Sequence, residues 1–206
     1  IKLGQALSTR SDLLGEELAA DLSDLQDRLE PFSGNEARAA IEAEFGRPMA
    51  TMFSRFDDQA VAAASIAQVH FAVTTEGKEV AVKVLRPGIE AAFAADLDLF
   101  FWVAELIKAT RPEMRRLKPV ESVKTLAESV TIEMDLRFEA SAAVELAENF
   151  ADDDSFNVPA VDWTRTGRRV LTTERIVGIP LDDREAILAA GHDPEKVLAK
   201  AAAAFF

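Results

Sequence analysis

The stretch that decides the fold is QVHFAVTTEGKEVAVKVL, residues 68–85. Two valine-rich runs flank a loop that contains Gly77, and this pattern predicts an antiparallel β-hairpin. Alternation along the second run places Ala81, Lys83 and Leu85 on one face of the strand. A lysine between apolar neighbours points either into a cleft or out of an edge strand, and taken alone the edge strand is the commoner case.

An alanine-rich stretch directly precedes the hairpin. It runs Ala62-Ala63-Ala64-Ser65-Ile66-Ala67-Gln68. Backbone N–H groups in such a turn can bind phosphate oxygens, although alanine methyl groups limit how closely the turn approaches them. A packing strip of small residues is the alternative interpretation.

A lysine that binds phosphates needs a carboxylate partner, and a predicted helix from Pro119 to about Phe150 supplies three candidates. At about 100° per residue, Asp135 and Glu139 lie within roughly 40° of each other, whereas Glu133 lies on a different face. Asp135 and Glu139 can therefore face a cleft together. The alternative is a solvated acidic face.

The remaining segments alternate between helices and short strands. A helix is expected from Ser11 or Asp12 to about Arg28, and Ser33 with Glu36 forms a capping box that starts a second helix. Further predicted elements are a strand at 52–56, a helix at 89–108, strands at 156–163 and 168–176, and helices from 182 onward with a break at 191–194. This order predicts an α+β arrangement with a small sheet.

Composition excludes several classes of protein. The chain carries 23 Lys and Arg against 36 Asp and Glu, a formal net charge of −13, so it repels phosphate backbones and nucleic-acid binding is not expected. It has no cysteine, which excludes disulfides and thiolate metal ligands. The sequence holds no run of about 18 apolar residues and no charged leader, so neither a transmembrane segment nor a signal peptide is predicted.

A basic cluster interrupts this acidic chain, formed by Arg111, Arg115, Arg116 and Lys118. Such a cluster is most often a solvated loop, and contact with lipid headgroups is the alternative. The two histidines, His70 and His192, are too few for a His-rich metal site, and neither is expected to be catalytic.

Four motifs follow one another along the chain: Lys2-Leu3-Gly4-Gln5, Ala62 to His70, Val80 to Lys83, and Glu133-Met134-Asp135 with Glu139. Their order and spacing resemble the KxGQ motif, the alanine-rich nucleotide loop, the lysine strand, and the ExD motif with its helix glutamate of the UbiB-type atypical kinase-like family. That family comprises ubiquinone-biosynthesis ATPases and includes the ADCK proteins. The resemblance covers the whole chain.

The resemblance implies a protein-kinase-like fold that binds MgATP and in which Lys83 pairs with Glu139. The lysine of this strand holds the α- and β-phosphates in such proteins. Glu133 and Asp135 would lie near the metal–nucleotide site as candidate Mg²⁺ ligands. The alanine-rich loop would cover the phosphates.

Two further sets of residues follow from the resemblance. Lys2 and Gln5 would lie on a helical extension over the cleft, where the extension blocks a protein substrate, so ATP hydrolysis or small-molecule phosphorylation is expected. The segment Thr173 to Ile176 resembles the kinase hinge. The backbone at Glu174 and Ile176 would hold adenine, with Thr173 at the gatekeeper position.

Three segments are predicted: a helical KxGQ extension at 1–48, a kinase-like N-lobe with the hinge at 49–180, and the beginning of a helical C-lobe at 181–206. The chain begins without a Met and ends at Phe206 within an apolar helical pattern, so we expect a piece of a longer protein that is inactive by itself.

A kinase also needs a catalytic-loop Asp and Asn and a second Mg²⁺-binding Asp. The resemblance places these groups after the helix near Pro194, so they and the main Mg²⁺ ligands are expected beyond Phe206. Asp182, Asp183 and Asp193 come too early to serve.

The predicted function is the nucleotide-binding part of an atypical kinase or ATPase that supports biosynthesis of ubiquinone or another isoprenoid quinone. The expected partners are MgATP, quinone-pathway proteins or a prenyl-lipid precursor and, through the full-length protein, the cytoplasmic side of a membrane. One alternative is a non-catalytic module that binds a prenyl lipid or a pathway partner. Another is a helical scaffold in which Lys83 and the carboxylates are merely exposed.

Overall fold

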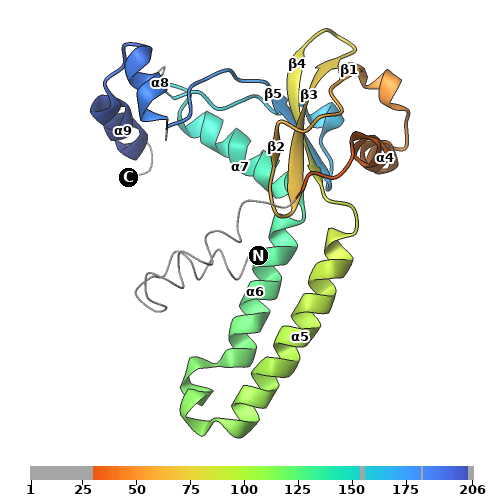
Figure 1. Ribbon diagram of the computed structural model, residues 1–206, viewed down its shortest axis with the longest axis vertical. Coiled ribbons are helices and arrows are strands. Elements are labelled where there is room, and N and C mark those ends of the chain that lie inside the picture. Colours follow the sequence, from red (N-terminus) through yellow and green to blue (C-terminus); the bar gives the residue numbers. More distant parts are fainter. Residues whose placement is uncertain (1–29, 154–155, 182, 204–206) are drawn as a thin grey trace.

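The computed structural model describes residues 30–153, 156–181 and 183–203. Its centre is an antiparallel sheet with helix α4 on one face and helix α7 on the other (Figure 1). The strands are β1 Phe53–Phe56, β2 Ala62–Ala63, β3 Ala67–Thr74, β4 Glu79–Leu85 and β5 Val170–Glu174. The helices are α4 Gly34–Phe45, α5 Ile89–Thr110, α6 Pro119–Glu133, α7 Leu136–Asn149, α8 Arg184–Ala189 and α9 Pro194–Ala203, with 3₁₀ turns η1 Met49–Thr51, η2 Pro112–Leu117 and η3 Trp163–Arg165. The predicted α+β fold with a small sheet is confirmed, while the helix predicted before residue 29 lies outside the described residues.

The β3–β4 hairpin forms as the sequence predicts. The strands pair antiparallel, with Val69 opposite Lys83 and Phe71 opposite Ala81. Gly77 has φ +85° in the connecting turn, a conformation that a residue with a Cβ rarely adopts. β5 pairs with the other side of β4, and β1 and β2 both pair with β3.

Side-chain alternation along the strands divides the interior into two apolar clusters, one on each face of the sheet. The cluster on the α4 side contains Ala37, Ile41, Met49, Met52, Phe53, Phe56, Ala72, Val80, Val82, Val84 and Val170. The cluster on the α7 side contains Ala67, Leu85, Val130, Met134, Leu136, Ala140 and Leu171. Helices on both faces therefore bury the valine-rich strands, which an isolated hairpin could not achieve.

Helix α4 begins at the predicted capping box. Ser33 Oγ accepts a hydrogen bond from the Glu36 N–H at 3.2 Å, and Glu36 Oε2 accepts one from the Ser33 N–H at 3.0 Å. The next residue, Gly34, lies against the backbone after β1, because a Cβ at this position would come within 2.6 Å of the Asp58 Cβ. The start of α4 is thus fixed by the capping box and by the close contact of Gly34 with Asp58 after β1.

The single helix predicted across 119–150 is wrong, because the chain forms α6 and α7 there. The backbone turns at Met134, which has φ −87° and ψ 7°. Asp135 is extended, and its carboxylate accepts a hydrogen bond from the Arg137 N–H at 3.1 Å, so it is the N-cap of α7. An Asp that binds backbone N–H groups competes with continuation of a helix. The predicted common helix face for Asp135 and Glu139 therefore does not exist.

The strand predicted at 156–163 is also wrong. This stretch makes one isolated bridge to the sheet, between Val161 and Thr173. Pro159 has no N–H group to contribute to a ladder, and a 3₁₀ turn begins at Trp163. The stretch is therefore extended chain beside β5 rather than a further strand.

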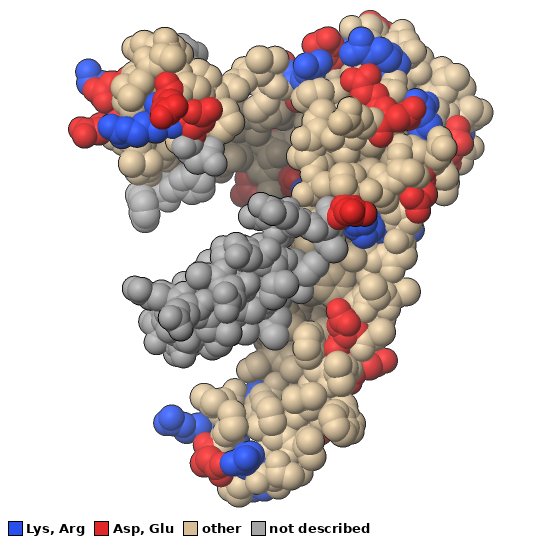
Figure 2. All heavy atoms as spheres, viewed as in Figure 1, with Lys and Arg blue, Asp and Glu red and all other residues tan. Residues whose placement is uncertain are grey.

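Helices α5 and α6 form a long hairpin that projects away from the sheet (Figure 1). Its tip carries the exposed basic cluster Arg111, Arg115, Arg116 and Lys118, and basic side chains are visible there in Figure 2. Exposed apolar side chains of α5 are Leu99, Trp102, Val103 and Leu106. Among the described residues, no helix combines the length and the apolar character that crossing a bilayer requires.

Candidate functional site

Lys83 lies on an inner strand, so the edge-strand interpretation of this lysine is wrong. Its neighbours across the sheet are Val69 on β3 and Leu171 on β5. Directly opposed residues in an antiparallel pair share a face of the sheet. The same face therefore carries Ala81 and, opposite it, Thr173. We call this surface the lysine face.

The Lys83 ammonium binds both oxygens of the Glu139 carboxylate. Nζ lies 2.8 Å from Oε1 and 2.7 Å from Oε2. The two side chains are 30% and 49% exposed, so the pair lies at the surface of the lysine face rather than inside the core. An ammonium has three N–H donors, and a pair with one carboxylate leaves capacity for a phosphate oxygen. This contact is the one that the resemblance to kinases implies.

Packing of α7 determines where Glu139 lies. Leu136 and Ala140 are buried in the cluster on this side of the sheet, together with Leu171. The Leu136 N–H also donates to the Arg168 carbonyl at 2.8 Å, just before β5. Because residues three or four apart share a helix face, Glu139 lies beside this buried surface and reaches past its edge to the sheet.

The alanine-rich stretch forms the tight β2–β3 hairpin next to the lysine strand. The Ala64 N–H donates to the Ala67 carbonyl at 2.8 Å and closes the turn. Ser65 is buried, and the Ile66 carbonyl accepts from the Arg86 N–H at 2.8 Å, which ties the turn to the end of β4. The hairpin therefore lies where the sequence predicts a phosphate loop, and its contact with phosphates stays a prediction.

Gln68, the last candidate binding residue of the predicted loop, points its side chain to the opposite face of the sheet from Lys83. The side chain is buried, and its carboxamide bonds to the backbone of Phe32 and to His70. These protein contacts occupy the carboxamide, so any contact of Gln68 with a nucleotide would use its backbone. No local pattern in the sequence indicates the partner at Phe32.

The carboxylate of Asp135 is bound to Arg137. Its Oδ1 accepts from Arg137 Nε at 2.8 Å and its Oδ2 from Nη2 at 2.6 Å. Hydrogen bonds from Arg137 hold the pKa of the Asp135 carboxyl below its ordinary value. Glu133 is exposed on the last turn of α6, and the described residues contain no cluster of three acidic or histidine side chains able to hold a metal ion. The Mg²⁺-ligand role of both carboxylates stays a prediction.

The predicted hinge follows the end of β5. The Glu174 N–H donates to the Ala160 carbonyl at 2.8 Å, which leaves the Glu174 carbonyl as the candidate contact for adenine. Ile176 lies beyond the strand and is 60% exposed. Thr173, at the predicted gatekeeper position, is half-buried on the lysine face.

A hollow of about 760 Å³ lies at the other end of β4, beside the β3–β4 turn. It includes the buried Arg165, which pairs with Glu76 at 2.6 Å and with Asp162 at 2.7 Å. Sequence analysis missed this network, because Glu76 and Arg165 are 89 positions apart. The hollow shares Glu174 with the predicted hinge but is not lined by Lys83.

The end of the chain adds no candidate for catalysis among the described residues. Asp183 caps α8 by accepting from the Ala186 N–H at 2.9 Å, and Asp193 accepts from the Glu195 N–H at 3.0 Å at the start of α9. His192 is exposed in the turn between these two helices. The two aspartates thus have capping roles in this structure.

The candidate site residues Lys2 and Gln5 lie outside the described residues, as do Asp182 and Phe206. The placement of the KxGQ extension over the cleft therefore stays a prediction, and so does the placement of the main Mg²⁺ ligands beyond Phe206.

Comparison with known proteins agrees with this arrangement. Residues 24–206 match the ABC1 atypical kinase-like domain. Two curated relatives are named "Probable protein kinase UbiB". The relative from Marinobacter nauticus is 41% identical over 206 residues, which cover 100% of this chain and 38% of the relative. The relative from Shewanella frigidimarina is 45% identical over 192 residues, which cover 93% of this chain and 35% of the relative. The chain therefore spans little more than a third of the length of these relatives.

A solved structure also resembles the chain. It is described as the complex of Rv3197 with erythromycin from Mycobacterium tuberculosis, and it matches with a TM-score of 0.64 and 31% identity over 87% of this chain and 45% of that one. Because the domain match includes every described residue, this chain belongs to the ABC1 atypical kinase-like domain family, and its fold is kinase-like.

Proposed function

We propose that this chain supplies the MgATP-binding part of an atypical kinase or ATPase that supports ubiquinone biosynthesis. The observation that carries the proposal is the Lys83–Glu139 pair, in which a carboxylate from a packed helix holds an accessible ammonium on the lysine face. Kinase-like phosphate binding requires such a pair. The names of the UbiB relatives support the pathway.

The lysine face provides an apolar surface against which the nucleotide base packs. Val69 and Ala81 are small apolar side chains opposite or next to Lys83 and suit the flat surface of a purine. In the bound complex Lys83 holds phosphate oxygens while Glu139 keeps its ammonium in place. The β2–β3 hairpin covers the phosphates through its backbone N–H groups, and the Glu174 carbonyl accepts from the exocyclic amine of adenine.

Mg²⁺ bound with the nucleotide neutralises phosphate charge. Glu133 and Asp135 are the carboxylates of this chain that we assign near it, and Asp135 takes up that role only when Arg137 shares or releases its oxygens. We assign the catalytic Asp and Asn and the main Mg²⁺ ligands to a segment beyond Phe206, so residues 1–206 bind nucleotide without turning it over.

The full-length protein is proposed to work at the cytoplasmic side of a membrane, with quinone-pathway proteins or a prenyl-lipid precursor as partners and without nucleic acid. The net charge of −13 argues against nucleic-acid binding. The relatives' name supports a place in quinone biosynthesis.

Calorimetric titration of the full-length protein with MgADP tests the proposal. Lys83→Ala is expected to abolish binding and to leave the fold intact, because a partly exposed ion pair contributes little to stability. Lys124→Ala, which removes an exposed lysine of α6, is the matched control and is expected to keep wild-type affinity. Undiminished affinity in a folded Lys83→Ala variant would overturn the assignment.

A further inference from the structure

Residues 30–33 lead from the N-terminal part of the chain into α4, and we call them the junction. One side chain binds the backbone of Phe32 at two points. The Phe32 N–H donates to Gln68 Oε1 at 2.9 Å, and Gln68 Nε2 donates to the Phe32 carbonyl at 3.0 Å. Gln68 pairs with Ala63 in the β2–β3 hairpin, so this contact fastens the junction to the alanine-rich stretch.

A second contact reaches the junction from the end of β4. Arg86 Nη2 donates to the Glu30 carbonyl at 3.0 Å, and the guanidinium lies 5.4 Å from the centre of the Phe32 ring. Arg86 follows closely on Lys83, and its N–H binds the Ile66 carbonyl of the alanine-rich turn. The junction is therefore fastened to both segments that would bind phosphate.

His70 fixes the direction of the Gln68 carboxamide. Gln68 Nε2 lies 2.8 Å from His70 Nε2, and His70 Nδ1 lies 2.8 Å from the Asp57 carbonyl. A backbone carbonyl can only accept, so Nδ1 carries the proton and Nε2 accepts from Gln68. Phe32 requires the same direction, because its N–H needs the amide oxygen and its carbonyl needs the amide nitrogen. The neutral imidazole is the form that satisfies every partner.

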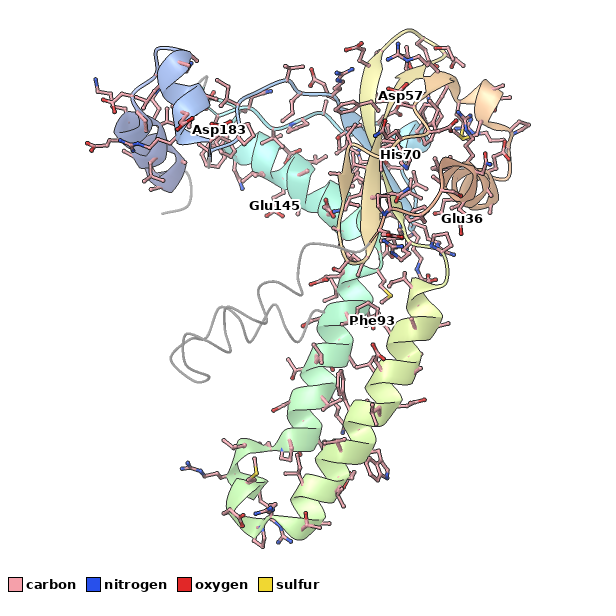
Figure 3. All side chains as sticks on the ribbon, in the orientation of Figure 1. Glu36, Asp57, His70, Phe93, Glu145 and Asp183 are labelled. Carbon is pink, nitrogen blue, oxygen red and sulfur yellow. The ribbon has the colours of Figure 1, made fainter. Side chains whose placement is uncertain are left out.

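The surroundings of His70 also favour the neutral form. Figure 3 shows His70 beside Asp57, on the side of the sheet that faces α4, and its ring stacks on Phe56 with the centres 4.8 Å apart. The charged groups near the ring are Asp57 and Asp58 after β1, and Arg38 of α4, which pairs with Asp58 at 2.6 Å. Burial lowers the pKa of His70, and it outweighs the opposing effects of the Asp57 carbonyl and the two carboxylates.

We propose that Gln68 is a positioning residue that couples the junction to the alanine-rich hairpin, and that His70 must be neutral for this coupling to hold. The inference rests on the proposed function, since the hairpin is taken as the phosphate loop. In the sequence, the junction directly follows the part of the chain that contains Lys2-Leu3-Gly4-Gln5.

Protonation of His70 breaks the coupling by a simple conflict of donors. A second N–H then points at the amide nitrogen of Gln68. If the carboxamide rotates to offer its oxygen to His70, its nitrogen faces the Phe32 N–H and its oxygen faces the Phe32 carbonyl. Each arrangement leaves buried polar groups unpaired, so the junction is released from the hairpin.

Two substitutions at His70 separate its acceptor from its donor. His70→Gln keeps an acceptor near the place of Nε2 and cannot be protonated, whereas His70→Asn keeps a donor near Nδ1 and lacks that acceptor. Because burial lowers the pKa of His70 from its ordinary value of 6.5, we expect wild-type MgADP affinity to hold at about pH 7.5 and to fall only as the pH drops below 6.5. His70→Gln is expected to keep high affinity across this range. His70→Asn and Gln68→Ala are expected to bind about tenfold more weakly throughout. A decline with pH that persists in His70→Gln would overturn the role of His70.

A charged variant distinguishes the proposed coupling from simple misfolding. Gln68→Glu places a carboxylate where a protonated His70 can donate to it, keeps an acceptor for the Phe32 N–H and removes the donor to the Phe32 carbonyl. The variant is therefore expected to bind MgADP more tightly at the lower pH than at the higher one, the reverse of the wild type. General loss of structure cannot produce this reversal, and its absence in a folded variant would contradict the proposal.

Amide hydrogen exchange at Phe32 tests the coupling without any nucleotide. We expect this N–H to exchange at least tenfold faster in Gln68→Ala than in the full-length wild type, and to stay protected in His70→Gln. Gln59→Ala, at an exposed glutamine after β1, is the control and is expected to change nothing. Protection at Phe32 without MgADP binding would refute the proposed function alone, whereas unchanged exchange in Gln68→Ala would refute the coupling.

Discussion

Asp135 occupies the position between two helices, and its carboxylate has two separate contacts there. It caps α7 through the Arg137 N–H and binds the Arg137 guanidinium with both oxygens. Neither contact requires a nucleotide, so Asp135 has a structural role whether or not it also approaches Mg²⁺. This role can be measured from stability alone.

Substitution of Asp135 should separate the cap from the ion pair. Asp135→Ala is expected to lower the free energy of unfolding by about 1 kcal/mol, because it removes the N-cap. Asp135→Asn keeps an oxygen for the Arg137 N–H and loses only the charge that pairs with the exposed Arg137, so a smaller loss is expected. Urea unfolding of the full-length protein, followed by circular dichroism, gives both values. Equal losses in the two variants would contradict the capping role.

Glu76, in the turn between β3 and β4, pairs with Arg165, and the contribution of this pair to stability depends on pH. Hydrogen bonds from Arg165, and then from threonines of the turn, lower the pKa of Glu76 to about 2, from an ordinary value of 4.5. A carboxylate whose pKa is lowered on folding stabilises the protein above its unfolded pKa, and this contribution is lost as the pH falls toward the folded pKa. Wild type and Glu76→Gln are therefore expected to differ in unfolding free energy at pH 7 and to converge as the pH falls from 4.5 toward 2. Urea unfolding at a series of pH values measures the difference, and a constant difference would contradict the assignment.

Among the elements, the β2–β3 hairpin carries the prediction closest to phosphate binding. Ala64 is exposed at its turn, and removal of the methyl group widens the accessible backbone conformations. Ala64→Gly is expected to bind MgADP about threefold more tightly, because the backbone N–H groups can approach the phosphates more closely.

The matched control for this hairpin is Ala50→Gly, at an exposed position of the 3₁₀ turn before β1. It is expected to leave the affinity unchanged in the same calorimetric titration. Equal effects at the two positions would mean that the alanine-rich stretch is only a packing strip.

Elements whose signals are local could be predicted from the sequence. The valine alternation around Gly77 and the pairing of Ser33 with Glu36 correctly indicated the β3–β4 hairpin and the start of α4. The break between α6 and α7 could not be found in this way. No glycine or proline stands between Pro119 and Asn149, so no local helix breaker marks the cap at Asp135.

The contacts of the candidate site likewise divide into those that the sequence predicts and those that it does not. Lys83 and Glu139 could be matched because each lies in a recognisable motif, although 56 positions separate them. Gln68 and Phe32 are 36 positions apart, and the partner is a backbone group, which has no sequence signature. Side-chain networks that use a distant backbone are therefore visible only after the chain has folded.

At the scale of the whole molecule, the sheet is supported from both faces, and the two supports contact the neighbouring strands β3 and β4. On the α7 side Glu139 reaches Lys83, and on the α4 side the junction reaches Gln68. The α5–α6 hairpin extends away from this centre, with its basic tip at the far end of an otherwise acidic chain (Figure 1, Figure 2). The region that we assign to the nucleotide is thus the part of the molecule that both layers of helix hold in place.

The most direct test of the central claim is labelling of the full-length protein with an acyl-phosphate derivative of ATP, read by mass spectrometry of lysine peptides. A lysine beside the phosphates attacks the acyl group, forms an amide at Nζ and releases ATP. We expect Lys83 to be labelled and excess MgADP to block its labelling, while any labelling of Lys124 is unaffected. Glu139→Ala should reduce the labelling of Lys83, whereas Glu145→Ala, elsewhere on α7 (Figure 3), should not. Labelling of Lys83 that MgADP does not block, or none at all in a protein that binds MgADP, would contradict the claim that the nucleotide phosphates lie against the Lys83–Glu139 pair.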